Sequence, residues 1–147
     1  MTDTAYYAQK WLRRTDELER SRIKAYYAAL ELMNKANHCT MSFERSGADP
    51  YLKQSRHEDL LCDFADACER LRYITLQCSL EDVETIHKLD TMGNNIYAAI
   101  LIDRYINRYS WDAIHKSKKY QVSRSALYDL HRKALEALGR KMAASMV

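Results

Sequence analysis

Residues 95–142 read NIYAAILIDRYINRYSWDAIHKSKKYQVSRSALYDLHRKALEALGRKM, and the prediction of the fold begins with this stretch. Apolar residues recur in it every three or four positions, as they do in amphipathic helices. The pattern breaks at residues 107–109 and again before Ser123. Ser110 and Ser123 each precede a new apolar segment, where a serine hydroxyl can accept a hydrogen bond from a free amide at a helix start. The stretch therefore predicts three helices.

The last two of these helices have the features of a helix-turn-helix. The first of the pair is short and has Trp111 and Ile114 on its apolar edge. The second carries one apolar stripe, formed by Leu127, Leu130, Ala134 and Leu138. In a helix-turn-helix the second helix enters the DNA major groove and presents its N-terminal side chains to base edges. We therefore predict that residues 123–142 form a DNA-reading helix.

The candidate DNA-binding side chains lie opposite the apolar stripe and in the turn before it. Arginine and lysine can contact phosphates or guanine, serine and aspartate can exchange hydrogen bonds with bases, and a tyrosine hydroxyl can contact phosphate. The predicted DNA-binding residues are Ser123, Arg124, Ser125, Tyr128, Asp129, Arg132 and Lys133 on the helix, and Lys116, Lys118 and Lys119 before it.

Charge is distributed unevenly along the chain. From Arg104 to Lys141 there are ten Lys and Arg residues against three Asp and Glu, a net charge of +7, whereas residues 1–103 have thirteen against seventeen, a net charge of −4. A basic segment on a mildly acidic body indicates a polyanion partner such as DNA. A solvated basic face or a protein contact is the alternative interpretation.

The third predicted helix and the residue before it contain the following pattern: Val122-Ser123-Arg124, Leu127, Leu130, Lys133-Ala134-Leu135 and Leu138. This pattern resembles the recognition helix of region 4 in bacterial sigma factors, which reads the promoter −35 element. The longer pattern RYINRYSWDAI…SRSALYDLHRKALEAL is similar to phage and prophage late-gene transcription regulators of the ArpU or RinA type from Gram-positive bacteria. The resemblance covers Ile96 to Leu138. It implies a helical N-terminal half, a sigma-region-4-like C-terminal half and promoter DNA as the partner.

The sequence departs from the sigma pattern in the turn. Eight residues separate Ile114 from Ser123, roughly two more than that pattern has, and none of them is glycine. A longer first helix or a looser turn is expected, and either changes the angle of the recognition helix. By position, the resemblance nominates as DNA-facing Arg124, Ser125, Ala126, Tyr128, Asp129 and Lys133.

Residues 1–92 predict a long helical hairpin. Thr4 is the expected cap of a first helix that ends near Asn37. Residues 39–55, rich in serine with one glycine and the single proline, form the expected loop. Phe43 and Tyr51 are expected to hold this loop against the helices. The coiled-coil spacing expected in the first helix is Ile23, Tyr26, Leu30, Met33 and Asn37, with Leu18, Ala25, Ala29 and Leu32 broadening the face.

The second long helix is expected from Arg56 to Asp90. Its coiled-coil spacing is the clearest in the chain: Leu60, Phe64, Ala67, Leu71, Ile74 and Cys78. Beyond Cys78 the stripe is expected to continue with a phase shift through Leu76, Leu80, Val83, Ile86 and Leu89. A lone helix-turn-helix binds DNA weakly, and dimerisation couples two half-site contacts. We therefore expect the hairpin to form a homodimer, with packing of its two helices inside one monomer as the alternative.

Signals of catalysis, metal binding and membrane insertion are missing from the sequence. No phosphate-binding glycine loop, G-x-S-x-G or H-E-x-x-H motif occurs, so no enzyme and no cofactor are expected. The four cysteines are expected to be buried, reduced thiols and not metal ligands. His131 is expected at the surface or against a phosphate. No apolar run can span a bilayer and no signal peptide is visible, so a cytoplasmic protein of a host bacterial cell is expected.

These patterns together predict an all-α protein, with a hairpin for dimerisation or interaction over residues 1–92 and a helix-turn-helix DNA-binding domain over residues 93–147. The predicted function is a sequence-specific transcription regulator of phage or prophage origin that binds double-stranded DNA. Host RNA polymerase is a further candidate partner. Two alternatives stay open: a polymerase-binding protein that mimics a sigma domain, and a DNA-packaging component like a small terminase subunit.

Overall fold

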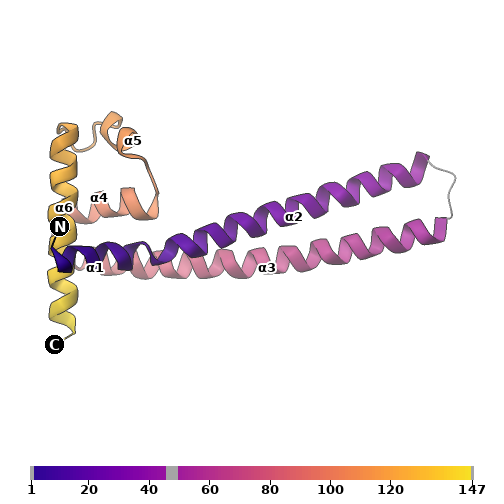
Figure 1. The fold of residues 1–147 in the computed structure, drawn as a ribbon, viewed down its shortest axis with the longest axis horizontal. Helices are drawn as coiled ribbons and strands as arrows, with labels where there is room; N and C mark the ends of the chain where they lie inside the picture. Colours follow the sequence, from indigo (N-terminus) through magenta and orange to yellow (C-terminus); the bar gives the residue numbers. More distant parts are fainter. Residues whose placement is uncertain (1, 46–49, 147) are drawn as a thin grey trace. The chain divides into compact units, whose positions relative to one another are not determined.

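The computed structural model describes the backbone of residues 2–45 and 50–146, and the side chains of residues 2–38 and 55–146. Over these residues the chain is all-α, as predicted, and has no strand. Figure 1 shows the helices in chain order: α1 (Asp3–Leu12), α2 (Arg14–Arg45), α3 (Pro50–Asp90), α4 (Asn95–Leu101), the π-helix η1 (Ile102–Ile106), α5 (Trp111–Lys116) and α6 (Arg124–Ser145).

The first predicted helix is two helices, divided at Arg13. At the break, two side chains donate hydrogen bonds to carbonyls at the end of α1. The Arg14 guanidinium donates to the carbonyl of Trp11 at 2.9 Å, and the Thr15 hydroxyl donates to that of Leu12 at 3.4 Å. The cap of α1 is Thr2 and not Thr4, with Thr2 Oγ1 accepting from the amide of Ala5.

The predicted loop over residues 39–55 is wrong in extent. Helix α2 continues to Arg45 and α3 begins at Pro50. Proline suits a first helical position, because its missing N–H would be unpaired there in any residue. The side chains of Phe43 and Tyr51 lie outside the described residues. The predicted end of the second long helix at Asp90 is confirmed, and α3 is continuous from Pro50 to that residue.

The helices divide into two compact units. One contains the chain up to Thr15 together with the chain from Leu80 onward, and the other contains residues 16–79. This division differs from the predicted boundary between residues 92 and 93. The difference arises because α1 packs on α6 and the last turns of α3 join the same core.

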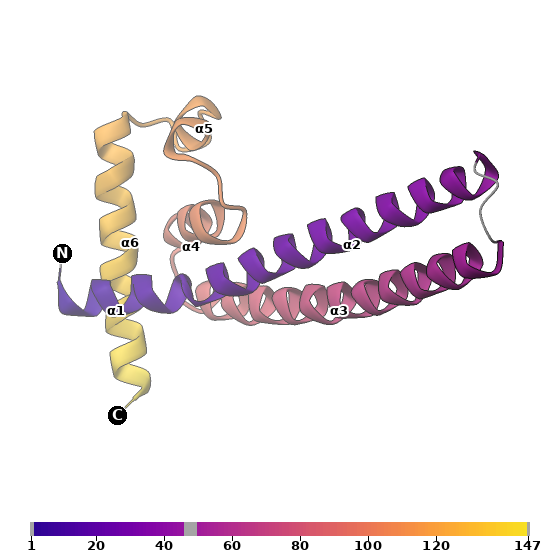
Figure 2. The same ribbon diagram turned by 45° about the vertical axis from the view of Figure 1, so that its right-hand side comes forward.

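The core of the first unit lies where α1 crosses α6 (Figure 2). Leu12, Leu89, Ile100, Leu101, Leu127, Leu135 and Leu138 are buried there. Helix α1 contributes small side chains, since Ala5 and Ala8 are fully buried. Gly139 faces α1, and a Cβ atom at this position would overlap the backbone carbonyl of Thr4. Small residues on both helices therefore allow the two backbones to approach closely.

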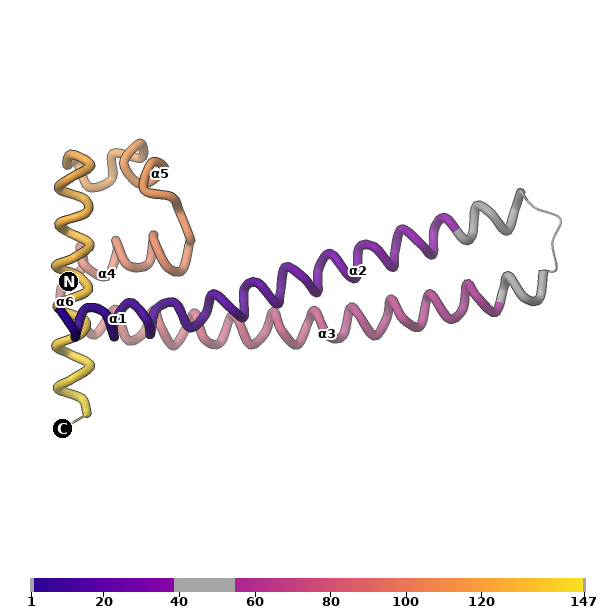
Figure 3. Tube along the Cα trace, in the orientation of Figure 1, coloured from indigo at the N-terminus to yellow at the C-terminus, as the bar shows by residue number. Residues whose placement is uncertain are grey.

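In the second unit, α2 and α3 run antiparallel beside each other (Figure 3). The face of α2 that packs is the alanine face, with Ala25, Ala29 and Ala36 buried. Ala25 and Ala29 were predicted to broaden the apolar face, and their burial agrees with that part of the prediction. Of the predicted coiled-coil residues, Leu30 is half-buried, whereas Ile23 and Tyr26 are 41% and 49% exposed and Met33 and Asn37 are also exposed. The predicted coiled-coil spacing was therefore wrong, because two apolar faces with helical spacing compete on α2 and small side chains permit the closer approach.

Helix α3 also carries two apolar faces. The predicted stripe from Leu60 to Cys78 includes the buried residues Ala67 and Cys78. Beyond Cys78 the buried face continues without a shift through Thr85 and Leu89. The expected phase shift is therefore wrong. The residues that suggested it form a separate exposed stripe, in which Leu76, Leu80 and Val83 are 59%, 61% and 65% exposed.

No helix among the described residues is both long enough and apolar enough to cross a membrane. All three cysteines with described side chains are free thiols. Cys78 is buried as expected, whereas Cys62 is exposed. The expected burial therefore does not hold for every cysteine.

Gly139→Ala is expected to destabilise the protein by about 1–3 kcal/mol, because the new methyl group must push α1 away from α6. Urea denaturation followed by circular dichroism measures this change. At an exposed helical position alanine is instead more stable than glycine by about 1 kcal/mol. Ala143→Gly, on the exposed side of α6, is the matched control and should cost that amount or less. A Gly139→Ala protein as stable as the wild type would contradict the close crossing.

Candidate nucleic-acid interface

Both helices of the predicted helix-turn-helix begin at the predicted serines. Ser110 Oγ accepts from the amide of Ala113 at 3.1 Å at the start of α5, and Ser123 Oγ accepts from the amide of Ala126 at 3.3 Å at the start of α6. Each hydroxyl pairs one of the amides that a helix start leaves without an intrahelical partner. Helix α6 then continues for 22 residues, three beyond the predicted end at residue 142.

The turn between α5 and α6 is the looser turn of the two expected alternatives, because α5 is short and ends at Lys116. The turn spans residues 117–123. Lys118 and Gln121 adopt left-handed backbone conformations, with φ of 55° and 52°, that usually favour glycine. The Ser117 hydroxyl donates to the carbonyl of Ile114 at 2.6 Å and closes the end of α5. The turn is therefore a defined structure built without glycine.

A buried carboxylate anchors this turn to η1. Asp103 accepts hydrogen bonds from Tyr120 Oη at 2.6 Å, from Lys119 Nζ at 3.1 Å and from Asn107 Nδ2 at 3.3 Å. Burial and the hydrogen bond to Asp103 raise the pKa of the Tyr120 hydroxyl, which therefore stays protonated as a donor. Asp103 thus holds two neighbouring residues of the turn in place.

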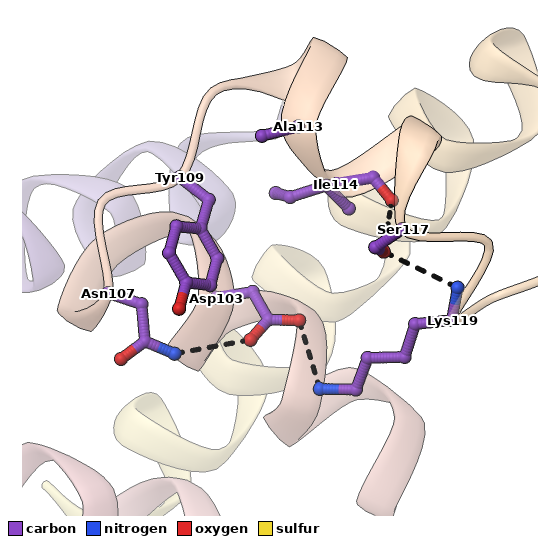
Figure 4. Close-up of a pocket in the computed structure, with 7 residues that line it drawn as sticks. All are labelled: Asp103, Asn107, Tyr109, Ala113, Ile114, Ser117 and Lys119. Atoms are coloured by element: carbon purple, nitrogen blue, oxygen red, sulfur yellow. Dashed lines mark hydrogen bonds and ion pairs between the residues drawn. The ribbon is translucent and has the colours of Figure 1, made fainter.

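A cavity of about 500 Å³ lies beside Asp103 (Figure 4). Its lining comes from η1, the segment after it, α5 and the turn after α5, and includes Tyr109, Ile114 and Ser117. The Lys119 side chain reaches toward Asp103 along its edge (Figure 4). Lys119 was predicted to contact DNA, and the structure shows its ammonium group engaged with this carboxylate.

Aromatic contacts join α5 to the first half of α6. The ring of Trp111 meets the rings of Tyr128 and His131 edge-on, with centroids 5.2 Å and 4.8 Å away. His131 Nε2 lies 2.8 Å from Tyr105 Oη, which also accepts a hydrogen bond from Gln9 at 3.1 Å. The expectation of a surface or phosphate-facing His131 was wrong, because its ring packs between aromatic side chains of η1 and α5.

The candidate DNA-binding residues of α6 form one surface over its first three turns. Asp129 is half-buried; the exposed residues are Ser123, Arg124, Ser125, Tyr128, Arg132 and Lys133, with Lys116, Lys118 and Lys119 in or beside the preceding turn. We call this set the α6 surface. The residue Ala126, nominated by the resemblance, is half-buried.

The three cations of α6 within this surface pair with carboxylates. The ion pairs are Arg124 with Asp112, Arg132 with Asp129 at 2.5 Å and with Glu136 at 3.2 Å, and Lys133 with Asp129 at 3.1 Å. Arg132 and Lys133 lower the pKa of the Asp129 carboxyl. Exposed pairs of this kind contribute roughly 0–1 kcal/mol each, so the cations can exchange a carboxylate for a phosphate at little cost.

Sequence reasoning missed the residues that support the α6 surface. Asp103, Tyr105 and His131 do not contribute to the exposed basic pattern, and their roles depend on contacts between distant segments. Arg104 was also missed; its guanidinium lies over the Trp111 ring at 5.2 Å and donates to the carbonyl of Tyr109. Its position in the basic segment was the only available signal.

Comparisons with known proteins add nothing to this geometry. No protein family, no curated protein and no solved structure matches the chain. Among the residues with described side chains, no group of three or more His, Cys, Asp or Glu could hold a metal ion. The α6 surface is therefore the feature from which a function is inferred.

His131 is expected to make the protein sensitive to acid. Burial, and then the charges of Arg104 and Arg13, lower its pKa from 6.5 to about 4. The unfolded chain takes up a proton below about pH 6.5 that the folded state does not bind, so the free energy of unfolding falls as the pH drops from 6.5 toward 4. Urea denaturation should show a loss of about 2 kcal/mol between pH 7 and pH 4.5 from this residue.

The variant His131→Gln separates this contribution from that of the carboxyl groups. Its free energy of unfolding should be lower than that of the wild type at pH 7, and should fall less between pH 7 and pH 4.5. Equal losses in the two proteins would show that His131 is protonated as easily in the folded state as in the unfolded chain.

Proposed function

We propose that this chain is a sequence-specific DNA-binding transcription regulator that inserts the first turns of α6 into the major groove of promoter DNA. The observation that carries the proposal is the α6 surface: exposed cations, hydroxyls and a tyrosine over three turns of a helix whose other face is buried. A phage or prophage origin and a sigma-region-4-like mode of binding rest on the resemblance of residues 96–138.

The packing of α6 against α1 and α5 supports this proposal. Its C-terminal half packs on α1 through Leu135, Leu138 and Gly139, whereas its N-terminal half contacts α5 through Trp111. A helix held firmly at one end and exposed at its N-terminal end can enter a groove without unfolding its own support. In this proposal α5 contacts the DNA backbone next to the groove.

The chemistry of the α6 surface also fits base reading. Arg124 and Ser125 lie in the first turn, where a recognition helix meets base edges. Lys116 and Lys118 are exposed before that turn and suit phosphate contacts. Tyr128 is 45% exposed, and its ring packs edge-on against the ring of Trp111. This contact restricts where its hydroxyl group lies on the surface. Self-association is part of the proposal, because a single small reader binds DNA weakly.

Arg124→Ala and Lys133→Ala are each expected to weaken binding to the cognate DNA by about 5- to 50-fold. Loss of a phosphate contact should also reduce the slope of log affinity against log salt by about one. Fluorescence anisotropy with DNA from the gene's own genomic neighbourhood, beside a scrambled sequence, measures both quantities. Circular dichroism should show wild-type helix content, since both side chains are exposed.

Lys35→Ala is the matched control for these variants. Lys35 pairs with Glu31 one turn earlier on α2, as Lys133 pairs with Asp129 on α6, and should have no effect on DNA affinity. Unchanged affinity of Arg124→Ala and Lys133→Ala would overturn the proposal. Strong polymerase binding without DNA binding would identify a sigma mimic, and a ring-sized assembly would identify a packaging subunit.

Asp129→Asn is expected to increase affinity for any DNA sequence by several-fold. The carboxylate of Asp129 is an acceptor shared by Arg132 and Lys133, and its charge repels phosphates. Its removal frees Lys133, leaves Arg132 paired only with Glu136, and makes the net charge of the α6 surface more positive by one. The same anisotropy titration, with cognate and scrambled DNA, tests this expectation. Weaker binding to both DNAs would show that the surface does not face phosphates.

A further inference from the structure

Helix α3 has an exposed apolar stripe that the fold does not use. Tyr73, Leu76, Leu80 and Val83 are 63%, 59%, 61% and 65% exposed. They recur at intervals of three, four and three residues, which is the a/d spacing of a coiled-coil seam. The buried face of the same helix, with Ala67, Cys78 and Leu89, lies on its opposite side. We call these four residues the outer stripe.

We propose that the outer stripe pairs with the outer stripe of a second copy of this chain, in antiparallel orientation, about a two-fold axis level with residue 78. This assigns a surface to the self-association that the proposed function includes, and it rests on that function for its purpose. Each copy would supply the same patch to an isologous interface.

The side chains of the outer stripe form matched layers in this orientation. Tyr73 faces the partner's Val83, and Leu76 faces the partner's Leu80. A large ring opposite a small β-branched side chain, next to leucine opposite leucine, gives layers of similar volume that interdigitate. The seam spans about 15 Å of helix, which is short, so the dimer should dissociate in roughly the micromolar range.

Charges beside the outer stripe favour the antiparallel second copy. Arg70 and Glu84 are both exposed and flank the same side of the stripe. In the antiparallel dimer Arg70 lies beside the partner's Glu84. By symmetry Glu84 lies beside the partner's Arg70, so the same ion pair forms twice. In a parallel, in-register dimer Glu69 would instead face the partner's Glu69, and Arg70 would be far from the partner's Glu84. Like charges facing each other across a seam are unfavourable.

Sedimentation equilibrium of the full chain, over concentrations from about 1 to about 200 µM, tests this interface. The wild type should change from monomer to dimer within this range. Leu80→Glu should stay monomeric with unchanged circular dichroism, because residue 80 is exposed in the single chain. Thr75→Glu, on an exposed part of α3 outside the stripe, should dimerise like the wild type.

A charge exchange tests the orientation. Glu84→Arg and Arg70→Glu should each weaken the dimer at least about tenfold, and the double variant Arg70→Glu with Glu84→Arg should restore it. A monomeric wild type, or a dimer insensitive to Leu80→Glu, would overturn the interface. So would failure of the double variant to recover.

The inference and the proposed function fail separately. Specific DNA binding by a protein that stays monomeric, or that dimerises through another face, would overturn only the pairing of outer stripes. A dimer that depends on Leu80 but binds neither cognate nor scrambled DNA would overturn only the proposed function.

Discussion

The close approach of α1 and α6 at Gly139 is the constraint on which the first unit depends. Without a Cβ at this position the backbone of Thr4 can lie against α6, and Leu12, Leu135 and Leu138 are buried around the crossing. Because the crossing involves the C-terminal half of α6, the first three turns are not covered by α1. The packing of α6 on α1 is thus separated along the helix from the surface proposed to bind DNA.

The buried carboxylate of Asp103 stabilises the long turn between α5 and α6, which contains no glycine. The left-handed conformations of Lys118 and Gln121 cost roughly 1–2 kcal/mol each. The two residues between them, Lys119 and Tyr120, donate hydrogen bonds to Asp103, and these bonds offset that cost. The consequence for the surface is that Lys119 in the basic turn, although exposed, is paired with a buried carboxylate.

Local signals predicted the features that depend on neighbours in sequence: the caps at Ser110 and Ser123, the apolar stripe of α6 and the end of α3. Features that depend on distant segments were missed. Ala5 and Ala8 gave no strong sign that α1 packs on α6, although a glycine inside the helix at residue 139 was a hint of a close contact. On α2 and α3, two apolar faces had similar spacing, and periodicity alone does not tell which face is buried.

The ion pairs on α6 reduce the contribution that the positive charge of residues 104–141 can make to binding a polyanion. The net charge of +7 counts every cation equally, but Arg124, Arg132 and Lys133 already lie beside carboxylates. In the proposed complex each phosphate contact made by these three side chains replaces an existing pair, so its net contribution is smaller than that of a cation without a carboxylate beside it. Coupling two proposed DNA-binding surfaces in one assembly raises affinity without adding charge, and this is the physical role proposed for the exposed apolar face of α3.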